Sequence, residues 1–225
     1  MLGGVPDAAR LFIESSTPRA SLALLRGSTV LHAETFTGDR SHNALLFAPL
    51  ERALAVLETG ETLAEVVIGT GPGSYSGTRV GIAAGQGVAL VHGCPAVGLS
   101  SLLAVPSARP GALAVGDARR GSAWSAGFGA EPELCSVDVL AEEIRGVLAA
   151  GAPVFSLETV AKVGLPGDLA AQVVLEQPTA EFLAKAWLAL SPDERSQRTA
   201  LPVQPAYLRP PHVTEAKGGH PLLRK

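Results

Sequence analysis

The segment formed by residues 68–90, IGTGPGSYSGTRVGIAAGQGVAL, constrains the fold more than any other part of the 225-residue chain. A short apolar run leads into a loop rich in Gly, Pro and Ser, and a helix is predicted to follow through about residue 92. Gly77, Gly81 and Gly85 are spaced four residues apart, so they form one stripe along this helix. A glycine inside a helix costs about 1 kcal/mol relative to alanine. We therefore expect a close approach by another backbone, either from the fold itself or from a partner subunit.

The loop before this helix lacks the two common phosphate-binding fingerprints. A Walker A loop needs Lys after its last Gly, whereas Thr78 follows Gly77, and a Rossmann loop needs Gly where Ser76 stands. What remains is a helix N-terminus at which Ser74 and Ser76 lie near free backbone N–H groups, with Arg79 one turn further along. Such an end can bind an anion or a nucleotide phosphate, and it can equally be a turn closed by a cap.

Glu14 is the second candidate polar contact. It ends a short apolar strand and precedes three hydroxyl residues, Ser15, Ser16 and Thr17. An acidic side chain at a strand end beside such a turn could hold a metal–phosphate group. The alternative, a solvated turn, stays open.

Hydrophobic periodicity predicts an α/β protein of two lobes, in which a strand meander and helices form layers. A Pro-containing linker at 106–110 sets the expected boundary between a lobe of residues 1–105 and a lobe of residues 106–225. Each half begins with a strand–turn–strand unit that carries an acidic residue, Glu14 or Asp117, which hints at an internal similarity.

The first lobe is expected to contain four strands and two helices, with a further strand and helix before the linker. Pro49 should kink or break the first helix. The expected elements are strands at 11–14, 20–25, 30–35, 65–69 and 95–98, and helices at 41–57, 76–92 and from 100.

The second lobe is expected to begin with two strands joined by a polar turn at 117–121. A Pro-rich polar tail should start at about residue 191, with a β-like island at 205–209, PAYLR. Between these come helices at 136–150 and 179–190 and strands at 152–157 and 171–176.

Composition argues against several classes of protein. The formal net charge of −3 and the sequence pI of about 6.0 disfavour a large nucleic-acid-binding surface. Cys94 and Cys135 lie far apart without CxxC spacing, so neither a disulfide framework nor a zinc knuckle is expected, and a reducing compartment fits. No apolar run is long enough to span a bilayer, and the N-terminus does not resemble a signal peptide. We expect a cytoplasmic protein without membrane association.

The sequence shows no catalytic centre and no metal site. A metal site on the first helix needs a second histidine four residues after His42, and Leu46 stands there. The chain also lacks a G-x-S-x-G elbow and a nucleophile with a base nearby in the sequence. We expect no catalytic residue, no metal and no cofactor.

Five segments taken together resemble the TsaB (YeaZ) family, whose bacterial members assist the threonylcarbamoylation of tRNA. The resemblance covers most of the N-terminal half and scattered parts of the rest, and the glycine-rich segment is its most specific motif. The segments are LFIESSTPRASLALL, SHNALLFAPLERAL, GTGPGSYSGTRVGIAAGQGVAL, GDARRGSAWSAGF and PAYLR.

The resemblance implies a two-lobed ASKHA-type fold, similar to that of the TsaD catalytic subunit, which carries metal-binding histidines and an ATP site. It also implies a non-catalytic role: pairing with a TsaD-like subunit and a TsaE-like ATPase, so that threonylcarbamoyl reaches N6 of the adenosine beside the anticodon (t6A). Leu46 stands where the second metal histidine falls, and Glu14 stands where the family usually has Asp.

The resemblance further implies a homodimer when the chain is alone, formed by the helical surface at 41–58 and 76–92. Contact with tRNA would occur only through the complex, and ATP or ADP could bind only at a subunit interface. The residues expected at the interface are His42, Leu45, Leu46, Pro49, Leu50, Gly77, Arg79, Gly81, Ile82, Gly85 and Gln86. Two other functions stay open: an ASKHA-type ATPase or kinase, and a metallopeptidase of the glycoprotease type.

Overall fold

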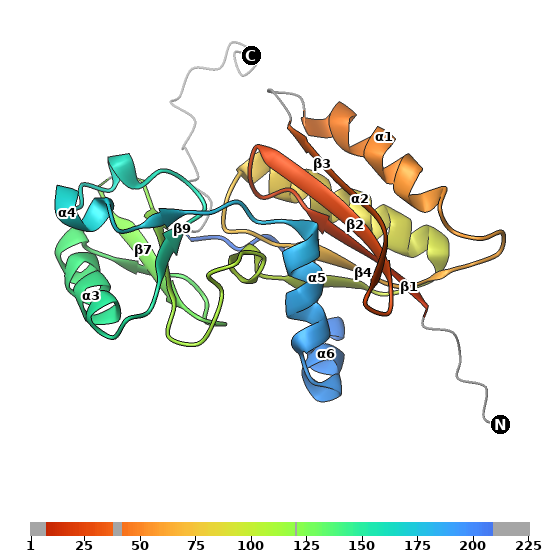
Figure 1. The fold of residues 1–225 in the computed structure, drawn as a ribbon. Coiled ribbons are helices and arrows are strands. Elements are labelled where there is room, and N and C mark those ends of the chain that lie inside the picture. Colours follow the sequence, from red (N-terminus) through yellow and green to blue (C-terminus); the bar gives the residue numbers. More distant parts are fainter. Residues whose placement is uncertain (1–7, 38–41, 120, 209–225) are drawn as a thin grey trace, which may run out of the picture.

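The computed structural model describes residues 8–37, 42–119 and 121–208, and for residues 42–45 it describes the backbone alone. Within these ranges the chain forms two lobes, each built on a five-stranded mixed sheet (Figure 1). The predicted fold class, α/β with mixed sheets flanked by helices, is confirmed. None of the helices in these ranges is long and apolar enough to cross a bilayer.

The first sheet has the strand order β3-β2-β1-β4-β5. β1, β2 and β3 are antiparallel, whereas β4 and β5 run parallel to β1. Its strands are β1 (Ala9–Glu14), β2 (Arg19–Arg26), β3 (Thr29–Thr37), β4 (Leu63–Gly69) and β5 (Ala96–Leu99). Helix α1 (His42–Leu54) connects β3 to β4, and helix α2 (Tyr75–His92) connects β4 to β5.

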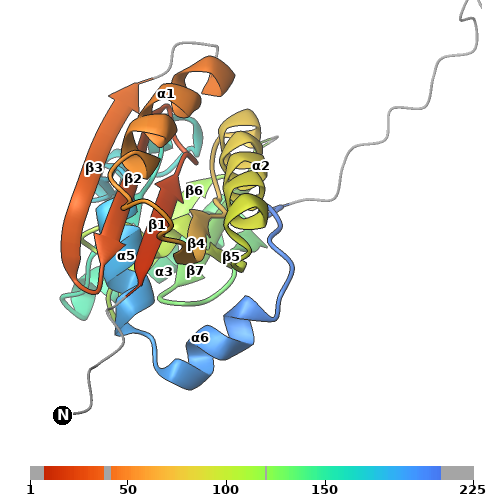
Figure 2. The same ribbon diagram turned by 90° about the vertical axis from the view of Figure 1, so that its right-hand side faces the viewer.

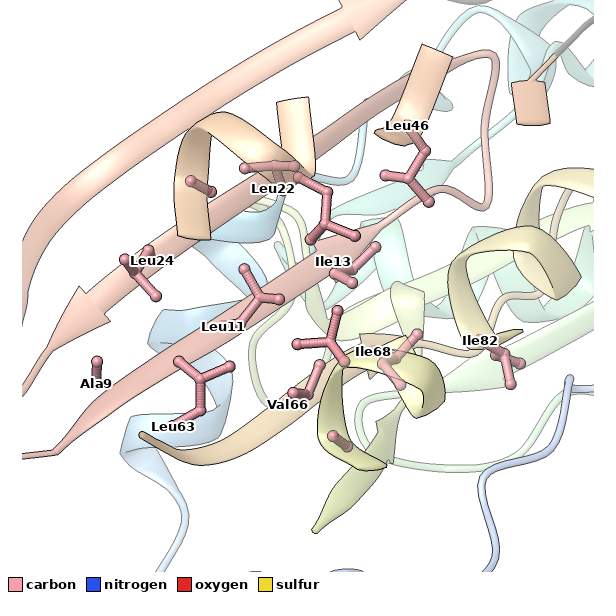
Figure 3. Close-up of a cluster of buried hydrophobic side chains, with 14 of the residues drawn as sticks. Ala9, Leu11, Ile13, Leu22, Leu24, Leu46, Leu63, Val66, Ile68 and Ile82 are labelled. Carbon is pink, nitrogen blue, oxygen red and sulfur yellow. The ribbon is translucent and has the colours of Figure 1, made fainter. Parts of the chain in front are cut away.

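Alternation along β1 separates two cores. Leu11 and Ile13 face α1 and α2, where they pack with Leu46, Ile68 and other apolar residues of the helices and strands (Figure 3). The intervening Phe12 points to the opposite face of the sheet, which helix α5 (Ala180–Ala189) covers with Leu183, Ala184 and Trp187. The first sheet is therefore covered by helices on both faces.

The second sheet repeats the topology of the first. Its order is β10-β9-β6-β7-β8, with β6, β7 and β8 antiparallel and β9 and β10 parallel to β6. Glu14 and Asp117 end the corresponding strands β1 and β6, so the internal similarity expected from the sequence is confirmed. The elements are β6 (Leu113–Asp117), β7 (Ala123–Gly127), β8 (Glu133–Cys135), α3 (Val137–Ala149), β9 (Val154–Ser156), α4 (Gly167–Ala170) and β10 (Val174–Leu175), with short 3-10 turns η1 (Ser101–Leu103) and η2 (Val160–Lys162).

Several predictions of local structure were wrong. Helix α1 runs through Pro49 without a break and ends at Leu54. The helix expected from residue 100 is the single 3-10 turn η1. The tail from 191 begins with helix α6 (Pro192–Thr199), whose capping box pairs Ser191 with Glu194. The β-like island at 205–209 forms no strand over its described residues 205–208, where Ala206 N donates to Thr70 O over 2.8 Å.

The C-terminal elements return to the first lobe. The helix predicted at 179–190 is confirmed as α5, and Thr179 caps it, because Thr179 Oγ1 accepts from Phe182 N over 3.2 Å. Trp187 Nε1 donates to Glu65 Oε1 over 2.6 Å, which anchors α5 to β4. The lobe boundary at residue 106 stays a prediction. Helix α5 lies after this boundary in the sequence but packs on the first sheet, which precedes it (Figure 2).

Candidate functional site

The glycine stripe of α2 lies against the chain's own first sheet. A Cβ at Gly77 or Gly81 would overlap Ser15, and a Cβ at Gly85 would lie 2.5 Å from Ile68 Cδ1. Ser15 Oγ donates to Gly77 O over 2.9 Å, so strand end and helix are also joined by a hydrogen bond. The close backbone approach predicted from the glycine spacing is confirmed at Gly77, where the Ser15 carbonyl just after β1 comes near. At Gly81 and Gly85 the neighbours are side chains, those of Ser15 and of Ile68 in β4.

This packing corrects the predicted interface for part of α2. Gly77, Gly81, Gly85 and Ile82 are buried within the chain, so they are not available to a partner. On α1, Leu46 and Pro49 are buried as well, and Leu46 points into the core (Figure 3). Leu50 is largely buried but lines the apolar groove described below. The side chains of His42 and Leu45 lie outside the described residues.

The loop before α2 is closed by its own contacts. Ser74 is the N-cap of α2, and its Oγ accepts from Gly77 N over 3.2 Å. Ser74 N donates to Ser16 O over 2.6 Å, and a Cβ at Gly73 would overlap the same carbonyl oxygen. Ser76 is exposed at the first turn. Of the two alternatives left open by the sequence, the capped turn accounts for Ser74, and an anion contact at this loop stays a prediction.

Glu14 and the turn that follows it are buried, so the solvated turn left open by the sequence is wrong, and a contact of Glu14 with a metal–phosphate group stays a prediction that this burial disfavours. The Glu14 carboxyl has no exposed surface, and a Cβ at Gly69 would overlap its Oε2. Oε1 accepts from Ser16 N over 2.7 Å, whereas Oε2 has no hydrogen-bond partner in the structure. Burial raises the pKa of the Glu14 carboxyl above its usual value, and the hydrogen bond from Ser16 offsets only part of that effect. A carboxyl enclosed in this way packs against the end of β4 and is shielded from solvent.

The burial of Glu14 makes stability depend on pH. Because the folded-state pKa is raised above the ordinary 4.5, the folded chain holds the proton more tightly than the unfolded chain. The free energy of unfolding therefore falls as pH rises from about 4.5 through the folded-state pKa. Glutamine has a similar shape and cannot ionise. We expect Glu14→Gln to gain stability relative to the wild type as the pH rises above about 4.5. Urea denaturation of both proteins measures this, and a difference in unfolding free energy that does not change with pH would disprove the assignment.

The corresponding strand end of the second lobe carries a closed ion-pair network. Asp117 Oδ1 accepts from Arg119 N over 2.7 Å, and Oδ2 pairs with Arg119 NH1 at 2.9 Å. Arg119 NH2 also reaches Glu158 Oε2 at 3.3 Å. Arg119 holds this position with a φ of 64°, a left-handed conformation that is uncommon outside glycine. Both acidic strand ends are thus engaged in contacts within the chain.

An apolar groove lies between α1 and α2 on the outer side of the first lobe. Its volume is about 520 Å³. It is bordered by Phe47 and by Val91, which are 60% and 84% exposed, and the neighbouring Leu90 is 84% exposed too. The two helices lie side by side on the same face of the sheet (Figure 2). The groove is lined by Phe47, Leu50, Leu54, Val80, Ala83, Ala84, Gly87, Val88, Val91 and His92.

The exposed ridge of α2 continues from this groove. Tyr75, Gln86 and Leu90, which are exposed, and Arg79, which is partly exposed, follow one another at helical spacing along α2. We call the groove together with this ridge the α1–α2 surface. Arg79 and Gln86, both predicted interface residues, lie on it, and so does Leu50 at the floor of the groove.

Sequence reasoning missed the most exposed members of this surface. Phe47, Leu90 and Val91 could have been found from the helical pattern, because they are large apolar residues on the polar side of amphipathic helices. Tyr207 contacts Arg79 across 128 positions of sequence, and no local pattern indicates that contact.

Comparison with known proteins identifies the family. The family model described as TsaD, tRNA N6-adenosine threonylcarbamoyltransferase, matches residues 35–172, more than half of the chain. The chain belongs to this family. The resemblance to its TsaB (YeaZ) members, drawn from the sequence, is confirmed by the relatives described next.

One curated relative is the tRNA threonylcarbamoyladenosine biosynthesis protein TsaB of Escherichia coli (strain K12). It is 32% identical over 125 residues, which are 52% of this chain and 54% of that protein. The match therefore spans about half the length of the curated relative. YeaZ from Pseudomonas aeruginosa has a TM-score of 0.64 at 21% identity, covering 89% of this chain and 100% of that one. A second Pseudomonas aeruginosa structure, described as similar to peptidase YEAZ, gives 0.64 at 22% identity over 90% and 100%. These two structures show the fold.

Metal binding by α1 does not fit the residues present. Leu46 stands where the resemblance places the second metal histidine, and its side chain is buried among the apolar residues between α1 and the sheet (Figure 3). In the parts of the chain that the structure describes, no group of three His, Cys, Asp or Glu side chains is arranged to hold a metal ion.

Proposed function

We propose that this chain is a non-catalytic subunit of the machinery that forms t6A in tRNA, and that it docks onto a TsaD-like catalytic subunit through the α1–α2 surface. A TsaE-like ATPase and the tRNA meet it only within that complex. In the absence of the TsaD-like subunit, the same surface joins two copies of the chain. Membership of the TsaD family and the name of the curated relative support a role for this chain in t6A formation.

The observation that carries the proposal is the exposed apolar groove. A groove of about 520 Å³ bordered by Phe47 and Val91, with Leu90 next to Val91 on α2, leaves large apolar side chains in water. Contiguous exposed apolar surface of this kind is typical of protein interaction sites. Its two walls are well anchored, because Leu46, Leu50 and Ala53 of α1 and Ile82, Val88 and Ala89 of α2 are packed into one core. A rigid surface loses little conformational entropy when a partner binds.

The burial of Glu14 favours this function over an ASKHA-type ATPase or kinase. An ATPase with its phosphate site at the end of β1 needs an acidic side chain that reaches the nucleotide or its metal ion. Glu14 instead lies wholly inside the protein, with Gly69 directly against its carboxyl. In this chain the end of β1 therefore packs against β4, where an ATPase would bind phosphate.

Reconstitution tests the proposal. Threonylcarbamoyl transfer to tRNA is measured with the purified TsaD-like and TsaE-like proteins of the same organism, with and without this chain. We expect little transfer in its absence, full transfer on its addition, and none by the chain alone. Equal transfer by the two partners without the chain would overturn the proposed role.

A further inference from the structure

Arg79 is held in a fixed position at the start of the exposed ridge of α2. Its guanidinium carbon lies 3.6 Å from the centre of the Tyr75 ring, and NH2 donates to the Tyr207 hydroxyl over 2.6 Å. The Tyr207 ring itself lies 5.5 Å from the guanidinium. Tyr75 is 65% exposed and Tyr207 is 50% exposed, so the rings hold the cation without enclosing it. We call these three residues the Tyr–Arg–Tyr cluster.

The cation in this cluster has no carboxylate counter-charge in residues 8–37, 42–119 and 121–208. The contact with Tyr207 uses one of the five N–H donors of a guanidinium. Stacking on Tyr75 fixes the plane in which the remaining donors lie. Arg79 therefore presents an ordered, unneutralised positive charge at the surface.

The cluster is continuous with the groove. Val80, the next residue after Arg79, lines the groove, and Ala83, one turn further along α2, lines it too. Gln86 and Leu90 extend the same exposed ridge toward the C-terminus of the helix. A protein seated on the apolar groove and extending over the ridge of α2 would therefore reach the guanidinium.

We propose that the Tyr–Arg–Tyr cluster binds a carboxylate side chain of the TsaD-like subunit at the rim of the α1–α2 surface. A guanidinium can hold a carboxylate through two parallel N–H···O bonds, which fixes the orientation of the two proteins as well as adding affinity. Because Tyr75 and Tyr207 already order the side chain, less rotamer entropy is lost on binding. Tyr207 acts as a positioning residue, and through it the C-terminal segment contributes to the surface.

The electrostatics favour a protein carboxylate over an RNA phosphate as the occupant. The chain carries a formal net charge of −3, and RNA-binding surfaces normally show a basic excess. This inference rests on the proposed docking of the TsaD-like subunit. It goes beyond that proposal by naming the polar contact that sets orientation.

Calorimetric titration with the purified TsaD-like subunit tests the inference. Arg79→Gln is expected to weaken binding about 10-fold at low salt, which is the usual range for a charge-assisted contact. The loss should shrink when NaCl is raised from about 0.05 M to about 0.5 M, because salt screens an exposed ion pair. Tyr207→Phe keeps the ring and removes the hydroxyl, so it should weaken binding by a smaller factor. Arg145→Gln on α3 is the control and should bind as the wild type does.

The outcomes separate this inference from the proposed function. If Leu90→Lys/Val91→Lys abolishes binding while Arg79→Gln binds like the wild type at every salt concentration, the carboxylate site is wrong and the docking surface stands. If the wild type does not bind the TsaD-like subunit, the proposed function fails. If Arg79→Gln leaves pairing intact but abolishes binding of tRNA by the isolated chain, the occupant is a phosphate, which overturns the inference.

Discussion

Replacing both Leu90 and Val91 with lysine is expected to weaken binding of the TsaD-like subunit by about 100-fold, or roughly 2.7 kcal/mol. Both side chains are 84% exposed at the C-terminal end of α2 and lie on the α1–α2 surface. Docking would bury two ammonium groups against apolar atoms, which is strongly unfavourable. Folding should be unaffected, because lysines near the C-terminus of a helix interact favourably with its dipole. Sedimentation or calorimetry with the purified partner measures the change.

A matched control separates docking from a general effect of added charge. Leu134→Lys places the same substitution on β8, an exposed edge strand of the second lobe. It should leave pairing with the TsaD-like subunit unchanged. The homodimer of the isolated chain should respond as the heterodimer does, since both are proposed to use the same surface. If the doubly substituted chain bound the TsaD-like subunit with wild-type affinity, the groove would not be the docking site.

Replacing Gly85 with leucine is expected to destabilise the fold by about 3 kcal/mol or more, the upper range for overpacking a core. A Cβ alone at this position would lie 2.5 Å from Ile68 Cδ1 and 2.7 Å from Ile68 Cγ1. Ile68 is fully buried in β4, so it cannot move aside without displacing the core around it. The expected result is a lower free energy of unfolding in urea denaturation.

Gly87 supplies the control within the same helix. A Cβ at Gly87 has no heavy atom within 4 Å, so Gly87→Leu adds the same side chain without a clash. It should be neutral or stabilise the fold by up to about 1 kcal/mol, because leucine favours the helix over glycine. Similar stability changes in the two variants would show that the glycine stripe is not needed for packing.

The glycine spacing predicted the main packing contact of the first lobe. Three glycines four residues apart required a close neighbour on one side of α2, and the structure supplies Ser15, just after β1, and Ile68 of β4 there. The spacing could not say whether that neighbour was part of the fold or a partner, because both satisfy the same steric demand. As a result, buried residues such as Gly81 and Ile82 were placed in the interface, and Phe47 and Val91 were not.

Long-range contacts account for the other differences. The burial of Glu14 depends on Gly69 and Ser101, which lie far from it in sequence. The contact of Tyr207 with Arg79 likewise depends on the return of the C-terminal segment to the first lobe. Helix α6 is different, since its capping box at Ser191 and Glu194 is a local signal that the Pro-rich composition of the tail obscured.

The central claim is that docking through the α1–α2 surface is what this chain contributes to tRNA modification. The most direct test measures threonylcarbamoyl transfer by the TsaD-like and TsaE-like proteins supplemented with one of three chains: wild type, Leu134→Lys, or Leu90→Lys/Val91→Lys. We predict full transfer with the first two and background transfer with the third. Full transfer with the doubly substituted chain, in a reaction where sedimentation detects no complex, would contradict the account.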